Sequence, residues 1–316
     1  MALELPMRVL GRTGIEVTHL GYGSLELRGV TDRAGVPQRE MTDKQAETVL
    51  NLVLDSGINF VDTANGYGAA EEHIGRYISK RRSEYFLATK ANARPWEPDG
   101  GAWSEDKIYR NVEESLDRLK TEYVDLLLLH NPLPEDVEKL NLVGALEEMR
   151  RQGKTRWIGI STNLPYLSSF AKVEAFDVFQ TSYSTLQPEH HDWITKLAED
   201  DRGIVIRTRA AKGEPDILGS LAHSMGITFT TDEERWANFE KANLDELRDV
   251  GESRAALILR YTFAHPKIST VIIGALNPDH LKENIQALRK GPLDLELVNE
   301  IHRRLSPLGF RSADVI

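Results

Sequence analysis

The chain has 316 residues, of which 41% are hydrophobic and 28% are charged, and its formal net charge at pH 7 is −10. This composition is ordinary for a soluble globular protein, and the negative charge argues against general binding to nucleic acid or anionic membranes. The sequence contains no cysteine, which excludes disulfides, thiolate nucleophiles and cysteine-ligated zinc.

The first residues, MALELPMRVLGRTG, lack the apolar core of a signal peptide. No apolar run approaches the roughly 18 residues that a membrane-spanning helix needs. We therefore expect a cytoplasmic protein without a membrane partner, which forms a single domain over residues 1–316. Nothing in the sequence pattern indicates an oligomeric state.

Short apolar segments alternate with amphipathic ones along the whole chain. Strands are expected at 19–23, 58–64, 85–90, 124–130, 157–162, 177–183, 203–209 and 269–275. Strands that are apolar throughout belong to parallel sheets covered on both faces. Eight such strands, each followed by a helix, predict an α/β fold of the (β/α)8 TIM barrel type.

The segments between the strands show helix signals. Thr42, Ser104 and Asn277 are expected N-caps, and one helix is expected over 135–153 with Gly153 as its stop. Outside the eight units, 7–18 reads as an N-terminal β-hairpin covering the bottom of the barrel, and 294–305 as an extra C-terminal helix. Residues 210–250 read as an irregular stretch, either a lid over a cofactor or a surface excursion.

Polar residues stand at the ends of three consecutive predicted strands. Asp62 ends the second strand, Lys90 the third and His130 the fourth, and Tyr67 follows in a glycine-rich turn. In α/β barrels the carboxyl ends of the strands carry the chemistry. Each residue alone is more often a turn former or a packed polar group. Together, these four types on one rim indicate a catalytic site.

The four residue types suit acid–base chemistry by the tyrosine. A free phenol has a pKa of about 10 and donates a proton poorly at pH 7, whereas a cation within about 4–6 Å favours the phenolate. Lys90 would be this cation and Asp62 its buried counter-charge. His130 would orient the substrate oxygen or share the proton. Such a site polarises a carbonyl while a cofactor delivers hydride, because no side chain carries hydride.

The stretch DTANGYGAAEEHIG (62–75) resembles the signature of the aldo-keto reductase family, and the strand ends at Lys90 and His130 match its remaining catalytic positions. The likeness runs from LGRTGIEVTHLGYGS to VIIGALNPDHLKEN and is that of a bacterial-type member with an N-terminal hairpin. It implies an NAD(P)-dependent oxidoreductase for carbonyl or CH–OH groups. Tyr67 would be the general acid, Asp62 and Lys90 its tuning pair, and His130 the substrate-orienting residue.

The resemblance also implies a nicotinamide cofactor that lies extended across the rim. The implied cofactor contacts are Gly23, Ser24, Leu25, Asp62, Ser161, Thr162, Asn163, Gln180, Arg207, Thr208, Arg209, Gly274, Leu276, His280 and Asn284. One departure from the family lies at the end of strand seven, where Arg207, Thr208 and Arg209 replace the usual aromatic residue or lysine. Which of the three stands beside the nicotinamide stays open.

A second departure concerns the 2′-phosphate of NADP. The family often holds this group with Arg, Lys or Ser at the positions of Leu276 and Asn277, which carry no positive charge here. The helix N-terminus that follows is still an anion site, and His280 or Lys282 could compensate. We expect NADP(H) as the cofactor, with NAD(H) as the alternative.

The substrate pocket is expected to include Leu25, Glu26, Trp96, Asn131 and Tyr183, because these residues flank the catalytic strand ends. Trp96 beside polar groups would suit a sugar or polyol, and it would equally suit loop packing. The expected partner is thus a small carbonyl or alcohol substrate, in either direction of reaction.

Other classes fit less well. GYGSLELRG lacks the spacing of a dinucleotide fingerprint. We expect no metal, because a metal-dependent barrel hydrolase would need several His and Asp at the rim. The remaining alternative is a cofactor-binding regulatory subunit with little turnover, like those relatives of the family that serve ion channels.

Overall fold

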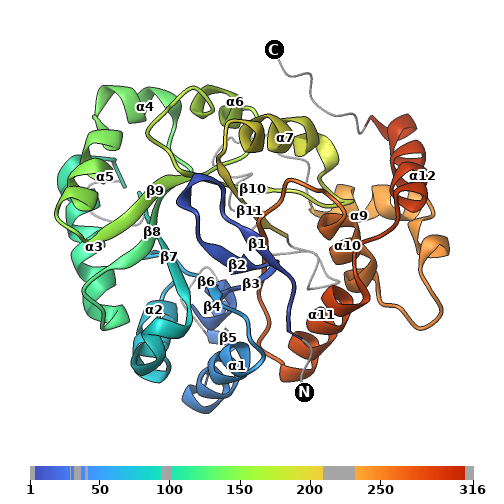
Figure 1. Cartoon of the computed structure of the whole chain (residues 1–316), viewed down its shortest axis with the longest axis horizontal. Helices are drawn as coiled ribbons and strands as arrows, with labels where there is room; N and C mark the ends of the chain where they lie inside the picture. Colours follow the sequence, from blue (N-terminus) through green and yellow to red (C-terminus); the bar gives the residue numbers. More distant parts are fainter. Residues whose placement is uncertain are drawn as a thin grey trace.

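The computed structural model describes residues 4–28, 30–31, 37–39, 42–93, 101–208 and 232–309. Eight parallel strands close into a barrel in the order β10, β11, β12, β3, β6, β7, β8, β9 (Figure 1). Their bounds are Leu20–Gly23 (β3), Phe60–Asp62 (β6), Phe86–Ala91 (β7), Val124–His130 (β8), Thr155–Ser161 (β9), Val178–Ser182 (β10), Gly203–Arg207 (β11) and Thr270–Ile273 (β12). All eight lie in or across the segments predicted as strands, so the predicted barrel is confirmed.

Two further pairs of strands lie outside the barrel. The antiparallel strands β1 (Met7–Val9) and β2 (Glu16–Thr18) form the predicted N-terminal hairpin. The strands β4 (Val30–Thr31) and β5 (Pro37–Arg39) form a second small antiparallel sheet, which the sequence pattern did not indicate.

Helices surround the barrel and cover its outer face (Figure 1). They are α1 (Asp43–Asp55), α2 (Ala70–Tyr77), α3 (Glu105–Leu119), α4 (Pro134–Lys139), α5 (Leu142–Arg151), α6 (Tyr166–Phe170), α7 (His191–Glu199), α9 (Asp232–Lys241), α10 (Arg254–Phe263), α11 (Pro278–Lys290) and α12 (Leu295–Leu305). Thr42, Ser104 and Asn277 each accept a backbone N–H as N-caps, as predicted. None of the helices in the described ranges has the length and apolar character needed to cross a membrane.

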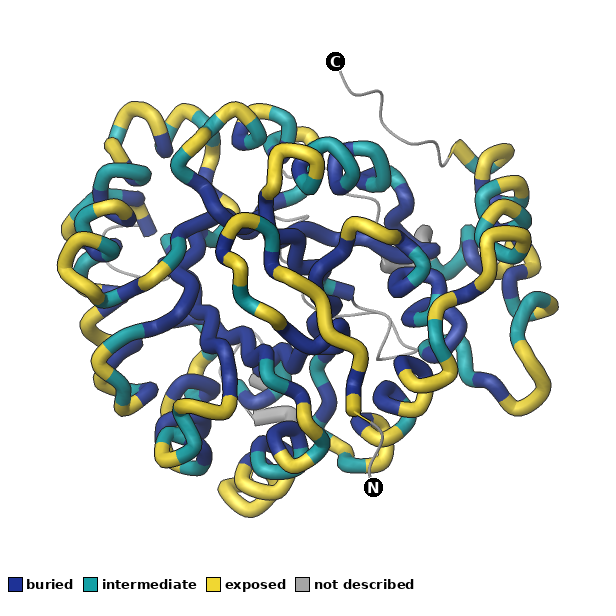
Figure 2. The backbone as a smooth tube through the Cα atoms, viewed as in Figure 1, coloured by how far each residue is buried: buried dark blue, intermediate teal, exposed yellow. Residues whose placement is uncertain are grey.

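The core has two layers because the barrel strands are buried on both faces (Figure 2). Every residue of β3, β6, β7, β10 and β12 is buried. One apolar cluster fills the barrel interior, and a larger one joins the strands to the surrounding helices. The signature glycine Gly75 lets α2 approach α3, because a Cβ there would stand 2.0 Å from the carbonyl oxygen of Arg118.

The segment predicted as one helix over 135–153 is two helices, α4 and α5. Asn141 stands between them with a left-handed φ of 49°, a conformation that Asn tolerates better than most residues. This turn redirects the chain before α5 begins. Gly153 follows α5 with a φ of 76°, in agreement with its predicted role as the stop.

The hairpin closes the N-terminal end of the barrel, as expected. Leu10 and Val17 belong to the interior cluster together with Phe60 and Phe86, which are the first residues of β6 and β7. A Cβ at Gly11 would lie 2.2 Å from the backbone of β11, so only glycine permits this close approach.

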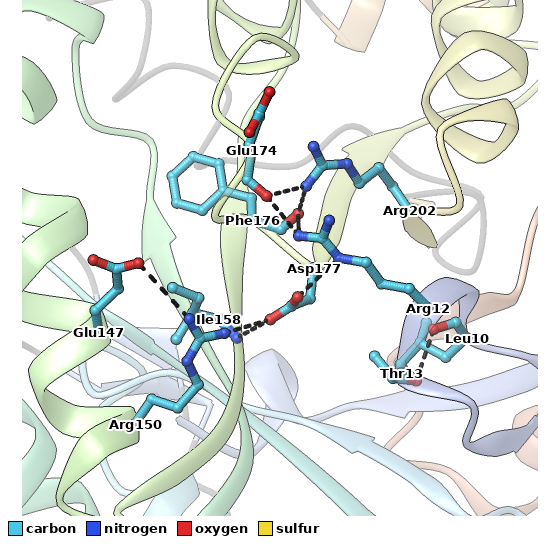
Figure 3. A network of polar contacts seen from close by, with 10 residues as sticks. All are labelled: Leu10, Arg12, Thr13, Glu147, Arg150, Ile158, Glu174, Phe176, Asp177 and Arg202. Atoms are coloured by element: carbon cyan, nitrogen blue, oxygen red, sulfur yellow. Dashed lines mark hydrogen bonds and ion pairs between the residues drawn. The ribbon is translucent and has the colours of Figure 1, made fainter.

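An arginine network attaches the hairpin to the loops at this end of the barrel (Figure 3). Arg12 donates from Nε to Asp177 at 2.9 Å, and from Nη2 to the carbonyl oxygens of Glu174 at 2.6 Å and Phe176 at 2.8 Å. Arg150 also donates to Asp177, at 3.3 Å. These side chains at the bottom of the barrel thus make structural contacts. In α/β barrels the chemistry takes place at the opposite rim.

The stretch 210–250 is more regular than expected where the structure describes it, since α9 and a 3₁₀ turn at Leu244–Leu247 lie within it. Arg254 of α10 bonds Asp245 and stacks 5.4 Å from the ring centroid of Phe239. These contacts fix residues 232–247 against the helical layer. Residues 210–231 lie outside the described residues, so for them the expectation that 210–250 forms either a lid over a cofactor or a surface excursion stays a prediction.

A buried chain of tyrosines and histidines attaches α12 to α10 and α7. Tyr183 donates to the hydroxyl of Tyr261 at 3.1 Å, so His191 Nδ1, at 3.0 Å, must donate to Tyr183. Tyr261 in turn donates to Nε2 of His302, at 2.6 Å. His265 packs 4.4 Å from His191, centroid to centroid. Burial lowers the pKa of all three histidines, that of His265 to about 4.

We expect this cluster to make the fold sensitive to mild acid. His265 titrates near 6.5 when unfolded, and its pKa is about 4 in the fold, so the unfolded state binds more protons between these values. Stability is therefore lost as pH falls through this window, by about 2 kcal/mol between pH 7.5 and 5. Urea unfolding of the protein and of His265→Gln at both pH values checks this. If the free energy of unfolding fell equally with pH in the two proteins, this expectation would be refuted.

Candidate active site

Five neighbouring strands bring polar side chains to one rim of the barrel. Asp62, Lys90, His130, Ser161 and Gln180 lie at or near the carboxyl ends of β6, β7, β8, β9 and β10, respectively. The register aligns these ends, because Ser161 pairs with His130 on one side and with Gln180 on the other. The rim predicted from the strand ends is therefore assembled.

A buried ion pair forms the floor of this site. Lys90 Nζ lies 2.6 Å from Asp62 Oδ2 and donates to the carbonyl oxygen of Thr63 at 2.7 Å. The lysine is 0% and the aspartate 2% exposed. Gln180 Nε2 donates to the other carboxylate oxygen, at 2.7 Å. Both Asp62 oxygens are thus bonded, which offsets the cost of burying the charge.

Tyr67 and His130 stand beside this pair. Lys90 Nζ is 5.0 Å from the ring centroid of Tyr67, and the Tyr67 and His130 rings meet edge to face with centroids 5.8 Å apart. Tyr67 sits in the turn that Gly68 closes with a φ of 49°. The structure therefore brings the four predicted catalytic residues together, with the phenol next to the buried ammonium.

The charge state of His130 follows from its surroundings. Burial lowers its pKa well below the ordinary value, and the positive charges of Lys90 and Arg207 lower it further. The ring is therefore neutral near pH 7. Its Nδ1 forms a hydrogen bond with Oδ1 of Asn92.

Asn92 is the site residue that the sequence reasoning missed. It follows β7 directly, is 7% exposed, and lies two positions after Lys90. Side chains two positions apart in a strand share a face, so this alternation was the signal that could have placed Asn92 in the site.

Further polar residues extend the rim along β9, β10 and β11. Ser161 Oγ donates to Gln180 Oε1 at 2.9 Å, which fixes the orientation of the glutamine amide. Asn163 Oδ1 accepts from Arg207 at 3.1 Å and from the Ser182 N–H at 3.0 Å. Among the described residues at the end of strand seven, Arg207 is the one whose guanidinium bonds Asn163 at this rim.

Beyond β6, the rim continues with the paired strands β3 and β12. A Cβ at Gly274 would lie 3.0 Å from Glu26, and one at Gly23 would lie 3.8 Å from the Gly274 nitrogen. Gly23 pairs with Asp62 across the two strands. The Glu26 side chain thus lies against the backbone at Gly274, next to the strand that carries Asp62.

The buried side-chain polar atoms that lack a partner among the described residues include two at positions predicted to contact the cofactor, namely Ser24 Oγ and Asn284 Nδ2. Ser24 is 0% and Asn284 4% exposed, and an unpaired buried polar group is costly. A bound polar ligand that supplies hydrogen-bonding atoms would satisfy both. The residues predicted for a dinucleotide therefore fit such a group at these two places.

The other residues predicted for the cofactor site and the substrate pocket differ in how far they are exposed. Thr162 and Thr208 are buried, Leu25, Glu26 and Leu276 are partly exposed, and Asn131 and His280 are exposed. Tyr183 is 2% exposed, and its hydroxyl is engaged by Tyr261 and His191, so it packs in the core rather than lining the pocket as predicted. Arg209 and Trp96 lie outside the described residues.

A closed barrel of eight parallel strands with polar side chains gathered at the carboxyl-end rim is the architecture of an α/β-barrel enzyme. The model of the Aldo/keto reductase family matches residues 19–305. The chain therefore belongs to the aldo-keto reductase family, and it is an NAD(P)-dependent oxidoreductase acting on carbonyl or CH–OH groups.

Individual relatives support this assignment. The chain is 30% identical over 293 residues to an uncharacterized oxidoreductase, YqkF, of Bacillus subtilis (strain 168). The aligned region covers 89% of this chain and 90% of YqkF. It is 25% identical over 326 residues to L-galactose dehydrogenase of Arabidopsis thaliana, with 96% of each chain covered. Among solved structures, aldo-keto reductase AKR11C1 from Bacillus halodurans (holo form) matches with a TM-score of 0.78, 27% identity, and 95% and 96% of the two chains covered.

Proposed function

We propose that this chain interconverts a carbonyl and an alcohol with Tyr67 as the general acid and base. The observation that carries the proposal is the buried Asp62–Lys90 pair beside the Tyr67 ring. A fixed cation at this position stabilises the negative charge that develops on the tyrosine oxygen during proton transfer. When bound, the nicotinamide cofactor supplies or takes up the hydride. The side chains position both reactants and move the proton.

We further propose where the cofactor is held. Ser161, Asn163 and Gln180 would bind its carboxamide end. Ser161 and Gln180 form a hydrogen-bonded chain to Asp62, and Asn163 bonds Arg207 at the end of β11. Gly23, Ser24 and Gly274 would contact the central part, and Asn284 would take the adenine end with its unpaired amide. Arg207, Thr208, Arg209, Leu25, Thr162, Leu276 and His280 complete the proposed contacts.

The substrate would enter above Tyr67, between Leu25 and Glu26 on one side and Asn131 on the other. The polar groups of Glu26 and Asn131 favour a hydroxylated carbonyl compound, such as a sugar. The name of the Arabidopsis relative, L-galactose dehydrogenase, points to the same class and to the oxidising direction.

A panel assay tests this function directly. The protein is mixed with NADPH or NADH and a series of aldehydes, ketones and sugars, and the loss of nicotinamide absorbance is followed. We expect turnover on at least one carbonyl. Tight cofactor binding without turnover on any of them would contradict the proposal and favour the alternative of a cofactor-binding regulatory subunit.

Cofactor choice provides a further prediction. Family resemblance favours NADP(H), but Lys282, the cation in the first two turns of α11, is bound to Asp279 at 2.9 Å. We therefore expect NADPH to bind more tightly than NADH by less than about tenfold, or 1.4 kcal/mol. Fluorescence titration of both cofactors measures this ratio. A preference clearly above about tenfold for NADPH, or any preference for NADH, would overturn this expectation.

A further inference from the structure

Asn92 is held in one orientation next to His130. Its backbone N–H donates to Asn111 Oδ1 at 2.8 Å, and its side-chain Nδ2 donates to the carbonyl oxygen of Lys90 at 2.9 Å. The amide is 7% exposed. Because the Lys90 carbonyl can only accept, the NH₂ group of Asn92 must face it. The amide oxygen is therefore the atom that faces the His130 ring.

This orientation determines which nitrogen of His130 carries the proton. An amide oxygen can only accept a hydrogen bond, so His130 Nδ1 must donate to Asn92 Oδ1. In a neutral ring the second nitrogen, Nε2, then has a free lone pair and accepts. We propose that Asn92 is a positioning residue that holds His130 as the Nδ1–H tautomer, so that His130 enters the reaction as a hydrogen-bond acceptor through Nε2.

The surrounding charges keep His130 in this form. Lys90 and Arg207 both disfavour a third positive charge at the ring. The Asp62 carboxylate that could offset such a charge is already bonded to Lys90 and Gln180. Tyr67 meets the ring edge to face.

The consequence for the reaction rests on the proposed function. A neutral His130 with an accepting Nε2 cannot donate a hydrogen bond to a substrate carbonyl oxygen, so that donation falls to the Tyr67 hydroxyl. Because the single O–H proton of Tyr67 is used for the carbonyl, Nε2 can instead accept from a hydroxyl group on the substrate. The proposal therefore predicts a preference for substrates that carry a hydroxyl group next to the reacting carbon.

The tautomer is measured directly by ¹⁵N NMR of the histidine rings in the full chain at pH 7.5, with His130 assigned through His130→Gln. We expect a protonated signal for Nδ1 and an unprotonated one for Nε2. The reverse pattern in the unmodified protein would overturn the inference, whatever the activity of the protein.

Two variants at position 92 separate positioning from folding. Asn92→Ala removes the acceptor, so we expect His130 to move towards the Nε2–H tautomer and kcat to fall by about tenfold or more. Asn92→Asp replaces it with a carboxylate, which should raise the titration midpoint of His130 by about one pH unit or more. An unchanged tautomer in the alanine variant would refute the positioning role.

Asn111→Asp is the matched control. It places a carboxylate against the backbone N–H of Asn92 rather than against the His130 ring. We expect the His130 midpoint to shift much less than in Asn92→Asp, and an equal shift would contradict direct contact as the cause. Absence of carbonyl turnover in the unmodified protein would refute the proposed function while leaving the NMR result intact.

Discussion

Replacing Tyr67 by phenylalanine should lower kcat by about 10²-fold or more, while cofactor affinity stays within about twofold. The ring packs against the Lys90 ammonium and the His130 edge, and phenylalanine preserves this packing. Only the proton-bearing oxygen is removed, so the loss should appear in the chemical step. Steady-state kinetics and cofactor titration on the same preparation measure both quantities.

Tyr109→Phe is a suitable control for this experiment. Tyr109 lies on α3 and packs partly buried against the helical layer of the core, outside the proposed machinery. The same loss of one hydroxyl should leave kcat close to that of the unmodified protein. If Tyr67→Phe retained full turnover, the assignment of the general acid would be wrong.

Replacing Lys90 by methionine should destabilise the protein by about 3–5 kcal/mol and abolish most of its activity. The substitution roughly preserves side-chain volume. It leaves the Asp62 carboxylate, which is only 2% exposed, without its counter-ion. Within the described part of the chain, Gln180 is then the one side-chain donor left to that carboxylate. Urea unfolding at pH 7.5 measures the loss.

The double variant Asp62→Asn/Lys90→Met tests the cause of this loss. It removes both charges, so it should recover a large part of the stability that Lys90→Met loses, yet stay inactive. A double variant as unstable as Lys90→Met would show that packing, and not an uncompensated charge, explains the effect.

The fold could be predicted because its periodicity is simple. Apolar segments such as VDLLLLH and STVIIGA can only be buried on both faces, and a regular alternation with helices leaves few architectures. The break between α4 and α5 could not be predicted in the same way. Asn141 adopts its left-handed conformation in a segment whose other residues are compatible with a continuous helix.

The candidate site was predictable where a residue ends a strand. Asp62, Lys90 and His130 occupy such positions, and parallel strands bring their carboxyl ends to one rim. Asn92 was missed although its alternation with Lys90 placed it on the same strand face, and Tyr183 was misplaced because the contacts of its side chain come from elements distant in sequence. Asn92 turns towards β8, and Tyr183 turns into the layer formed by α7 and α10.

The central claim is that the Tyr67 hydroxyl transfers the proton during hydride exchange. Single-turnover kinetics with enzyme preloaded with NADPH test it most directly, because product release often limits kcat. We predict that nicotinamide absorbance decays about 10²-fold or more slowly in Tyr67→Phe than in the unmodified protein. Equal single-turnover rates for the two proteins would contradict the claim.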